Sequence, residues 1–305
     1  MHIKSDDKEH FLHITRRKYR KQYKRLKRLY GHDEYLVDPK AIMKKRQLFK
    51  YWRKKELLFS KVKDSPIYMT DELWYSVTPE ILAVFLAKFL RACLPNANKI
   101  LDVFCGGGGN AIQFAKLFSQ VYGVDNAIEH LFCTFKNAQT YGVGDRIWLK
   151  YGPWERISAR GRFAKLGIDC IFGSPPWGGP QYLKQDVYDL ELALKPMGIT
   201  ELLKSFAKIS DNIVLFLPRN SDLHQLSRAT RSVMGADAKC RILKVSVHGY
   251  VKGIYCMWGQ SLVDSSKQSD SQIEVGYVDS QDDNAEEKSE AEAIKRDPVN
   301  YEIDG

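Results

Sequence analysis

A strand, a run of glycines and a helix follow one another at residues 99–118, and this order constrains the fold more than any other feature. Residues 99–104 (KILDVF) are typical of a buried strand, and residues 110–118 (NAIQFAKLF) are typical of a helix. Between them, CGGGG lets the backbone approach a ligand closely, and the helix start offers free N–H groups. A flexible linker would not be bounded by two such elements. The stretch predicts a ligand-binding turn.

Apolar strands and helices alternate through the centre of the chain. The expected strands are residues 99–104, 121–125, 146–150, 168–174 and 212–218. Helices are expected at 110–118, 127–142 and 199–209, with two more that begin at the caps Thr78 and Ser221. This alternation predicts a parallel sheet with helices on both faces. Residues 240–247 and 253–259, joined by HGYVK, predict a hairpin that adds an antiparallel edge strand.

Charge is distributed unevenly along the chain. Residues 1–63 contain 21 Lys and Arg against 7 Asp and Glu, whereas residues 264–305 contain 4 against 13. We therefore expect a basic arm at 1–45, a helical extension at 46–77, a catalytic domain at 78–263 and an acidic, disordered tail at 264–305. The cluster of cations at 11–30 fits RNA phosphates or a nuclear-import signal, although a merely solvated basic face is an open alternative.

The six cysteines do not indicate a metal site or a disulfide framework. None belongs to a C-x-x-C pair, and none lies near a His at zinc-ligand spacing. Most lie in apolar runs, which favours structural thiols in a reduced, intracellular protein. No apolar run is long enough to span a membrane, and the first residues have no signal-peptide pattern. The sequence predicts no metal and no membrane partner.

The glycine turn leaves two cofactors open until its acidic residues are considered. Gly106, Gly108 and Ala111 satisfy the G-x-G-x-x-A pattern of NAD-binding proteins, and Asp125 follows at the expected distance. Asp102, however, lies inside the expected strand, where a carboxylate needs a cationic or donor partner. A sulfonium amino acid supplies such a cation and NAD does not. The pattern D-x-F-x-G-x-G-G resembles class I methyltransferases that use S-adenosylmethionine.

A second motif, FGSPPWGGP at 172–180, follows the fourth expected strand. Ligands of open α/β sheets bind outside the carboxyl ends of the strands. Because Pro175 and its neighbour have no N–H, the carbonyls of Ser174 and Pro175, with the Ser174 hydroxyl, form a rim of acceptors suited to an exocyclic amine. Trp177 then offers a flat face on which a base stacks, at about 1–3 kcal/mol per base.

Seven short segments resemble one enzyme family more specifically, and they occur in the same order as in that family. They are KYW, LFSK, WYSVTPE, LDVFCGGGGN, SPPWGGPQY, LPRNSD and KGIYCMWG. Together they resemble the trimethylguanosine synthase family of RNA cap guanosine-N2 methyltransferases, and its fungal members in particular. The resemblance spans residues 48–259. It implies a class I, Rossmann-like fold with a seven-stranded, mostly parallel sheet, an antiparallel edge strand and an N-terminal helical extension.

The resemblance also assigns residues to roles. As catalytic residues it implies Ser174, Pro175 and Trp177. As cofactor-binding residues it implies Phe59, Thr78, Asp102, Cys105, Gly106, Gly108, Asn110, Asp125 and Trp154. As cap-binding residues it implies Lys50, Trp177, Arg219 and Asn220. Pro153 stands where many methyltransferases have an acid that contacts the cofactor's adenine, so Trp154 is the alternative contact.

The implied reaction is dimethylation of N2 of the 7-methylguanosine cap of small nuclear and nucleolar RNAs. Partners would be these RNAs and the proteins of their particles, in the nucleus and nucleolus. Ser174 stands where DNA adenine methyltransferases have Asn or Asp, which argues against DNA adenine as substrate. A guanine-N2 or adenine-N6 methyltransferase of rRNA or tRNA is the first alternative, and a catalytically silent RNA-binding scaffold is the second.

Overall fold

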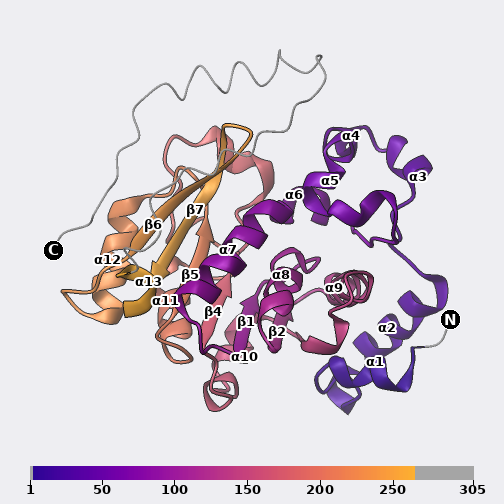
Figure 1. Ribbon diagram of the computed structural model, residues 1–305, viewed down its shortest axis with the longest axis horizontal. Coiled ribbons are helices and arrows are strands. Elements are labelled where there is room, and N and C mark those ends of the chain that lie inside the picture. The colour runs from indigo at the N-terminus through magenta and orange to yellow at the C-terminus, as the bar shows by residue number, and fades with distance from the viewer. Residues whose placement is uncertain (1–2, 265–305) are drawn as a thin grey trace.

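A seven-stranded sheet forms the centre of the molecule (Figure 1). The computed structural model describes residues 3–264. The strands are β1 (Lys99–Val103), β2 (Gln120–Asp125), β3 (Ile147–Tyr151), β4 (Cys170–Gly173), β5 (Ile213–Leu217), β6 (Arg241–Val247) and β7 (Tyr250–Trp258). Their order in the sheet is β3-β2-β1-β4-β5-β7-β6. The first five are parallel, whereas β7 is antiparallel to both β5 and β6. This confirms the predicted sheet and its hairpin.

The hairpin turn is shorter than the sequence indicated. Only His248 and Gly249 connect β6 to β7, with φ angles of 52° and 78°. Two consecutive positive φ angles are the geometry of a tight two-residue hairpin turn. The predicted five-residue connection is therefore wrong, because residues 250–252 continue the ladder opposite β6.

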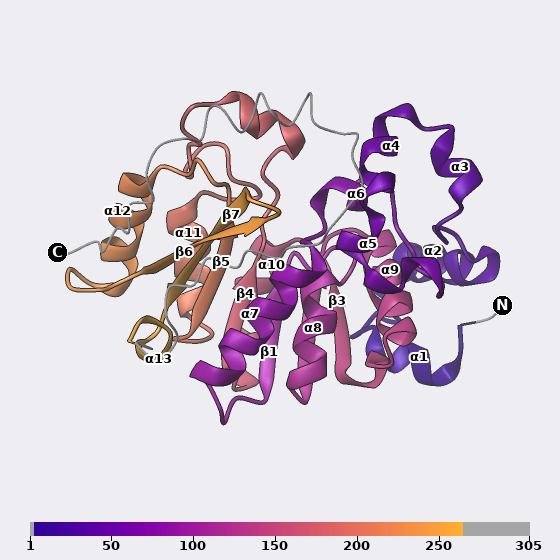
Figure 2. The ribbon, with the colours of Figure 1, turned by 45° about the horizontal axis from the view of Figure 1, so that its top comes forward.

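Helices cover both faces of the sheet. One face carries α7 (Glu80–Cys93), α8 (Gly109–Leu117) and α9 (Ile128–Thr140), and the other carries α10 (Trp154–Ser158), α11 (Ile199–Ala207) and α12 (Leu223–Met234). Figure 2 shows α7 and α8 side by side across the first face. Consecutive strand residues point to opposite faces, so Ile100 packs under α7–α9 and Leu101 packs toward α10–α12. The short helix α13 (Gln260–Val263) follows β7.

Two predicted helix caps shift by one residue. The N-cap of α7 is Pro79 rather than Thr78, whose buried hydroxyl instead accepts a hydrogen bond from Asn110. The N-cap of α12 is Asp222 rather than Ser221, and its carboxylate accepts from the N–H groups of His224 and Gln225. The Ser221 hydroxyl donates backwards to the carbonyl of Pro218 at 2.7 Å. The sequence therefore located both helix starts to within one residue.

The segment predicted as a basic arm is folded onto the domain. It forms α1 (Ser5–His10), η1 (Arg17–Tyr19), α2 (Arg20–His32) and α3 (Pro39–Met43), and α2 lies beside α9 (Figure 1). Leu26 and Leu29 of α2 are fully buried. The Leu12 N–H donates to the carbonyl of Leu149 in β3 at 2.8 Å. Phe11 forms a parallel bridge with Leu149 at the β3 edge, and a turn follows at residues 12–15.

The extension, residues 46–77, consists of short helices rather than one long one. They are α4 (Arg46–Arg53), α5 (Lys55–Leu58), η2 (Ser60–Lys63) and α6 (Leu73–Ser76). Further 3-10 turns are η3 (Gly144–Arg146), η4 (Phe163–Lys165) and η5 (Gly179–Lys184). The acidic tail predicted at 264–305 lies outside the described residues, apart from Asp264.

Candidate functional site

The glycine turn between β1 and α8 has the strained backbone that its sequence predicts. Gly106 and Gly108 have φ angles of 52° and 86°, a region that other residues rarely adopt. A Cβ atom at Gly108 would lie 3.0 Å from the Thr134 side chain, and one at Gly109 would lie 3.0 Å from Val77. Only glycine therefore fits this turn, which starts α8.

Asp102 is a buried carboxylate at a position where a cationic group would bind favourably. Its side chain is 1% exposed, and neither carboxylate oxygen has a hydrogen-bond partner. Burial and the charge of Asp125 raise the pKa of Asp102 well above its ordinary value, and the backbone N–H of Ala111, which does not reach bonding geometry, lowers it only in part. An unpaired buried carboxylate is costly. The ammonium group of an amino-acid cofactor fits this position.

Asp125, at the carboxyl end of β2, is held in a fixed orientation. Its Oδ2 accepts from the N–H of Gly106 at 3.0 Å, and its Oδ1 accepts from the N–H of Ala127 at 2.8 Å. The Nδ1 atom of His130 lies 3.3 Å from Oδ1. The structure thus brings Asp125 and the glycine turn together, as predicted, and a carboxylate retains further lone pairs for the hydroxyls of a ribose.

One face of α9 supports this turn, and sequence reasoning missed it. The Thr134 hydroxyl donates to the carbonyl of Gly106. Asn137, which is fully buried, donates to the carbonyl of Gly107 at 3.0 Å. Together with His130, these residues recur at helical spacing on one side of α9. That spacing of polar residues at positions i, i+4 and i+7 along one side of the helix was the available signal.

The remaining cofactor candidates are Thr78, Cys105 and Asn110 at the glycine turn and Phe59 in the extension. Asn110 Nδ2 donates to the Thr78 hydroxyl at 2.9 Å, and the buried Asn110 Oδ1 has no partner. Burial raises the pKa of Cys105, whose Sγ lies 4.0 Å from the Thr134 hydroxyl. Phe59 is 2% exposed, and its ring lies 6.2 Å from that of Tyr141. Asn110 is therefore the member of this group that still offers a buried acceptor.

Trp154, the residue proposed as the alternative adenine contact, lies in the core beneath α11. Its side chain is 1% exposed, and its Nε1 donates to the Ser205 hydroxyl of α11 at 2.8 Å. Its ring meets that of Phe206 edge-on at 5.5 Å and lies 6.5 Å from that of Phe163. The indole thus has its polar group paired and packs between α11 and η4.

The proline–tryptophan loop lies next to the glycine turn. Strand β4 pairs with β1 so that Gly173 lies opposite Val103, and the Ser174 N–H donates to the Val103 carbonyl at 3.4 Å. Pro175 is buried and Ser174 is half-buried. Both motifs therefore leave the sheet at one edge, as the sequence predicted.

Trp177 is held edge-on between two other aromatic rings. The ring of Tyr182 lies 5.3 Å away at 83°, and that of Phe216 lies 5.1 Å away at 61°. Trp177 itself is half-buried, and its buried Nε1 has no hydrogen-bond partner. These two contacts fix the plane of the indole.

Besides Trp177, the predicted cap-binding residues are Lys50, Arg219 and Asn220, and each has different neighbours. Lys50 projects from α4, with its Nζ 5.2 Å from the ring centre of Tyr51. Arg219 donates to the carbonyl of Val251 in the hairpin at 3.4 Å. Asn220 Nδ2 donates to the carbonyls of Tyr182 and Gln185, so it holds the segment that follows the Trp177 loop.

The extension reaches this loop through two tyrosines. The ring of Tyr51 lies 6.2 Å from that of Tyr75 in α6. A Cβ atom placed on Gly179, two residues after Trp177, would lie 4.0 Å from the Tyr75 ring. Lys50 is thus on an element connected to the proline–tryptophan loop.

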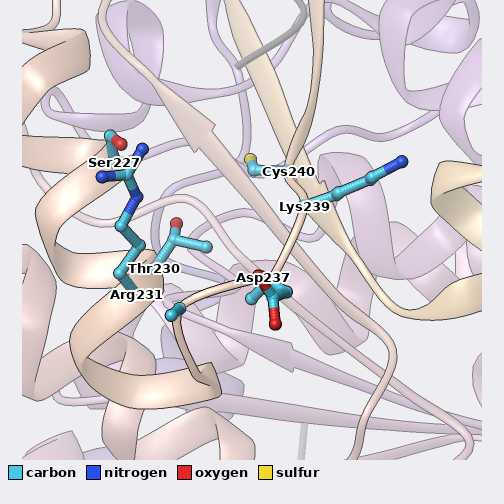
Figure 3. Close-up of a pocket in the computed structure, with 8 residues that line it drawn as sticks. Ser227, Thr230, Arg231, Asp237, Lys239 and Cys240 are labelled. Carbon is cyan, nitrogen blue, oxygen red and sulfur yellow. The ribbon is translucent and has the colours of Figure 1, made fainter. Parts of the chain in front are cut away.

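The rest of the described chain contains a cavity but no cluster of metal ligands and no helix suited to cross a membrane. Within residues 3–264, no group of three His, Cys, Asp or Glu is placed to hold a metal ion. A cavity of about 140 Å³ lies between α12 and the start of β6, and none of its lining residues belongs to the candidate site (Figure 3). No described helix is both long and apolar enough to cross a membrane.

Two curated fungal proteins are similar in sequence to this chain. Trimethylguanosine synthase of Saccharomyces cerevisiae is 59% identical over 245 residues, which cover 80% of this chain and 78% of that protein. Trimethylguanosine synthase of Schizosaccharomyces pombe is 35% identical over 212 residues, covering 69% of this chain and 85% of that protein.

The fold and the family follow from two further matches. The crystal structure of a Porphyromonas gingivalis protein described as a methyltransferase superposes with a TM-score of 0.54 at 15% identity, covering 70% of this chain and 49% of that one. Residues 97–261 match the family model of the RNA cap guanine-N2 methyltransferases. The chain has a methyltransferase fold and is a member of the RNA cap guanine-N2 methyltransferase family.

Proposed function

We propose that this enzyme transfers two methyl groups from S-adenosylmethionine to N2 of a 7-methylguanosine RNA cap and so forms the 2,2,7-trimethylguanosine cap. The observation that carries this proposal is the junction of β1 and β4. At this junction Asp102, whose carboxylate is unpaired, lies opposite Phe172, two residues before the proline–tryptophan loop begins. The two fungal relatives named trimethylguanosine synthase support the same product.

The cofactor-side residues orient the methyl donor. When bound, S-adenosylmethionine supplies an electrophilic methyl group on its sulfonium sulfur. Asp102 pairs with its ammonium group, which removes the cost of an unpaired buried carboxylate. Asp125, fixed by Gly106 and Ala127, accepts from the ribose hydroxyls. Each interaction fixes the position of the sulfur relative to the proline–tryptophan loop.

The substrate-side residues bind and aim the base. Trp177 stacks on the 7-methylguanine, whose positive charge adds about 0.5–2 kcal/mol of cation–π attraction to the stacking energy. The carbonyls of Ser174 and Pro175 and the Ser174 hydroxyl accept the two hydrogens of N2, which aims its lone pair at the methyl group. Lys50 and Arg219 bind the cap phosphates. Catalysis then rests mainly on alignment of the two reacting atoms.

Methylation at N7 serves chemistry as well as binding. The N2 lone pair of guanine is delocalised into the ring, which makes N2 a poor nucleophile. A methyl group on N7 makes the ring cationic and its N1–H more acidic, and loss of that proton returns electron density to N2. The reaction therefore needs no side chain as general base at N2 itself.

The decisive experiment is incubation of the full chain with labelled S-adenosylmethionine and a short cap dinucleotide, followed by mass analysis. The 7-methylated dinucleotide should gain two methyl groups, both on N2. The unmethylated dinucleotide is the matched control and should gain none. Equal turnover of both dinucleotides would overturn the role given to N7, and transfer to ribosomal RNA without cap competition would indicate the alternative substrate class.

The substrates are proposed to be capped small nuclear and nucleolar RNAs, with the proteins of their particles as partners in the nucleus and nucleolus. An uninterrupted set of exposed cations on η1 and α2 supports a role in holding the RNA body: Arg16, Arg17, Lys18, Arg20, Lys21, Lys24, Lys27 and Arg28. No acidic residue occurs between residues 10 and 32. Such a surface binds phosphates without reading sequence.

A further inference from the structure

His130 of α9 lies between two carboxylates from different parts of the chain. Its Nδ1 is 3.3 Å from Oδ1 of Asp125, and its Nε2 is 3.7 Å from Oε2 of Glu72, the N-cap of α6 in the extension. The side chains of His130 and Asp125 are 13% and 8% exposed, whereas that of Glu72 is 57% exposed. One ring nitrogen of the imidazole therefore faces a buried acid at the cofactor site, and the other faces an acid at the protein surface.

This arrangement requires a particular protonation state. An ionised carboxylate only accepts hydrogen bonds, and a neutral imidazole has one donor and one acceptor. A neutral His130 would therefore turn a lone pair toward either Asp125 or Glu72. Only the imidazolium form donates toward both at once. Two carboxylates at ion-pair distance from the ring therefore favour the charged state of His130.

We propose that His130 is a positioning residue of the cofactor site: its imidazolium form fixes the Asp125 carboxylate and ties it to Glu72 of the extension, so cofactor binding weakens as His130 loses its proton. This inference rests on the cofactor site of the proposed function and adds its regulation by pH. His130 does not touch the reacting atoms and acts through Asp125.

The charges around His130 favour this state. On its own helix lies Glu129, which pairs with Arg25 of α2 at 2.7 Å, and behind Asp125 lies the buried Asp102 of β1. Burial by itself lowers the pKa of His130, but Asp125, Glu72 and Glu129 outweigh it and raise that pKa above its ordinary value.

The direction of the pH effect follows from that sign. A histidine with a raised pKa contributes its ion pairs fully below its unfolded value of about 6.5, and it loses them as the pH rises through the folded value. The ion pair that fixes the Asp125 carboxylate is therefore fully formed only in mildly acidic solution. Because physiological pH lies just above the ordinary range of histidine, small changes there alter the charged fraction.

The test is calorimetric binding of S-adenosylhomocysteine, the product form of the methyl donor, between about pH 6 and about pH 8. This ligand keeps the ribose and lacks the sulfonium charge, so a trend reports on Asp125 rather than on sulfonium repulsion. For the unaltered chain, affinity should fall by about three- to tenfold over this interval, which is the range of a partly shielded ion pair. Thermal unfolding without ligand in the same buffers checks that the fold is intact.

Three variants separate positioning from packing. His130→Gln should bind weakly with a flat pH profile, whereas His130→Lys, which stays charged, should retain affinity at the upper end. Glu72→Gln should shift the midpoint to lower pH without disturbing the core. The exposed His32→Gln is the control and should follow the unaltered chain.

Each result decides a separate point. If the unaltered chain and His130→Gln have the same slope, or if His130→Gln binds as tightly near pH 6, the positioning role is overturned. If His130→Gln fails to fold, the slopes of His130→Lys and Glu72→Gln decide. Absence of binding by the unaltered chain at every pH would instead contradict the proposed function.

Discussion

Asn137 of α9 pairs with both backbone groups of Tyr68, a residue of the extension. Its Oδ1 accepts from the Tyr68 N–H at 2.8 Å, and its Nδ2 donates to the Tyr68 carbonyl at 3.0 Å. The same Nδ2 donates to the carbonyl of Gly107 in the glycine turn at 3.0 Å. One buried amide thus joins the extension to the cofactor turn.

Replacement of Asn137 by Ala should therefore affect both stability and cofactor binding. The change leaves the backbone groups of Tyr68 and Gly107 unpaired in the core, at a cost of about 2–4 kcal/mol in the free energy of unfolding. Urea denaturation measures this loss. The exposed Asn96→Ala is the control and should be nearly neutral. A loss no larger than that of the control would show that the bridge is dispensable.

Asp102→Asn should stabilise the ligand-free protein while weakening cofactor binding. A carboxyl whose folded pKa is raised binds more protons in the folded state, so its effect on stability becomes more unfavourable as the pH rises above its unfolded pKa. At neutral pH the neutral amide should therefore gain about 1–3 kcal/mol. Loss of the ion pair with the cofactor's ammonium should raise Kd about 10- to 100-fold.

Calorimetry and denaturation on the same Asp102→Asn preparation test both halves of this prediction. The exposed Asp145→Asn of η3 is the matched control and should change neither quantity. Unchanged cofactor affinity in Asp102→Asn would remove the reason for assigning Asp102 to the methyl donor.

Trp177→Ala should abolish methyl transfer to the cap and leave cofactor affinity almost unchanged. The loss of stacking and cation–π attraction weakens cap binding by about 2–4 kcal/mol. Trp177→Phe keeps a smaller plate between Tyr182 and Phe216 and should retain part of the activity. Cap binding by fluorescence, together with calorimetry of the cofactor, distinguishes the two effects. A parallel loss of cofactor binding would mean that Trp177 supports the loop rather than the base.

Neutralising part of the basic surface should weaken RNA binding without affecting the short cap substrate. RNA affinity falls as salt is added, and the slope of log affinity against log salt is therefore negative. Changing Lys21, Lys24, Lys27 and Arg28 to Gln should make this slope less steep by about 0.7–0.9 for each phosphate that the variant no longer neutralises. A capped RNA and a cap dinucleotide are measured in parallel. Four exposed cations elsewhere, Lys88, Lys204, Arg231 and Lys239, provide the control set.

Substitution is preferable to deletion in that experiment because of how α2 is packed. Leu26 and Leu29 are fully buried against the domain, so removal of residues 1–45 would open the core as well as remove charge. Retention of full RNA affinity and an unchanged salt slope in the four-residue variant would contradict the RNA-binding role of this surface.

The sheet and its two motifs could be predicted from sequence because their signals are local. Strands β1, β2 and β4 are short apolar runs followed by glycine, acidic or proline residues, and their ends define the site. Hence the sequence alone predicts that Asp102, Asp125 and Trp177 belong to one site. The parallel order also determines which strand ends meet.

The contacts that could not be predicted are those with partners distant in the sequence. Trp154 follows β3 in the sequence, yet the Ser205 hydroxyl and the Phe206 ring of α11 draw it into the core. Thr78 has the sequence of a helix cap, but Asn110 donates to its hydroxyl. His130 was missed because its two partners are not adjacent to it in sequence.

The position of β7 has a consequence for biosynthesis. This strand is the last of the seven to leave the ribosome, yet it lies inside the sheet between β5 and β6. Until residue 258 has emerged, β5 presents an open, apolar margin to solvent, and β6 has no neighbour on which to form. Nascent chains are therefore exposed to aggregation until a late moment of translation, and a premature stop before residue 250 would leave a permanently open sheet.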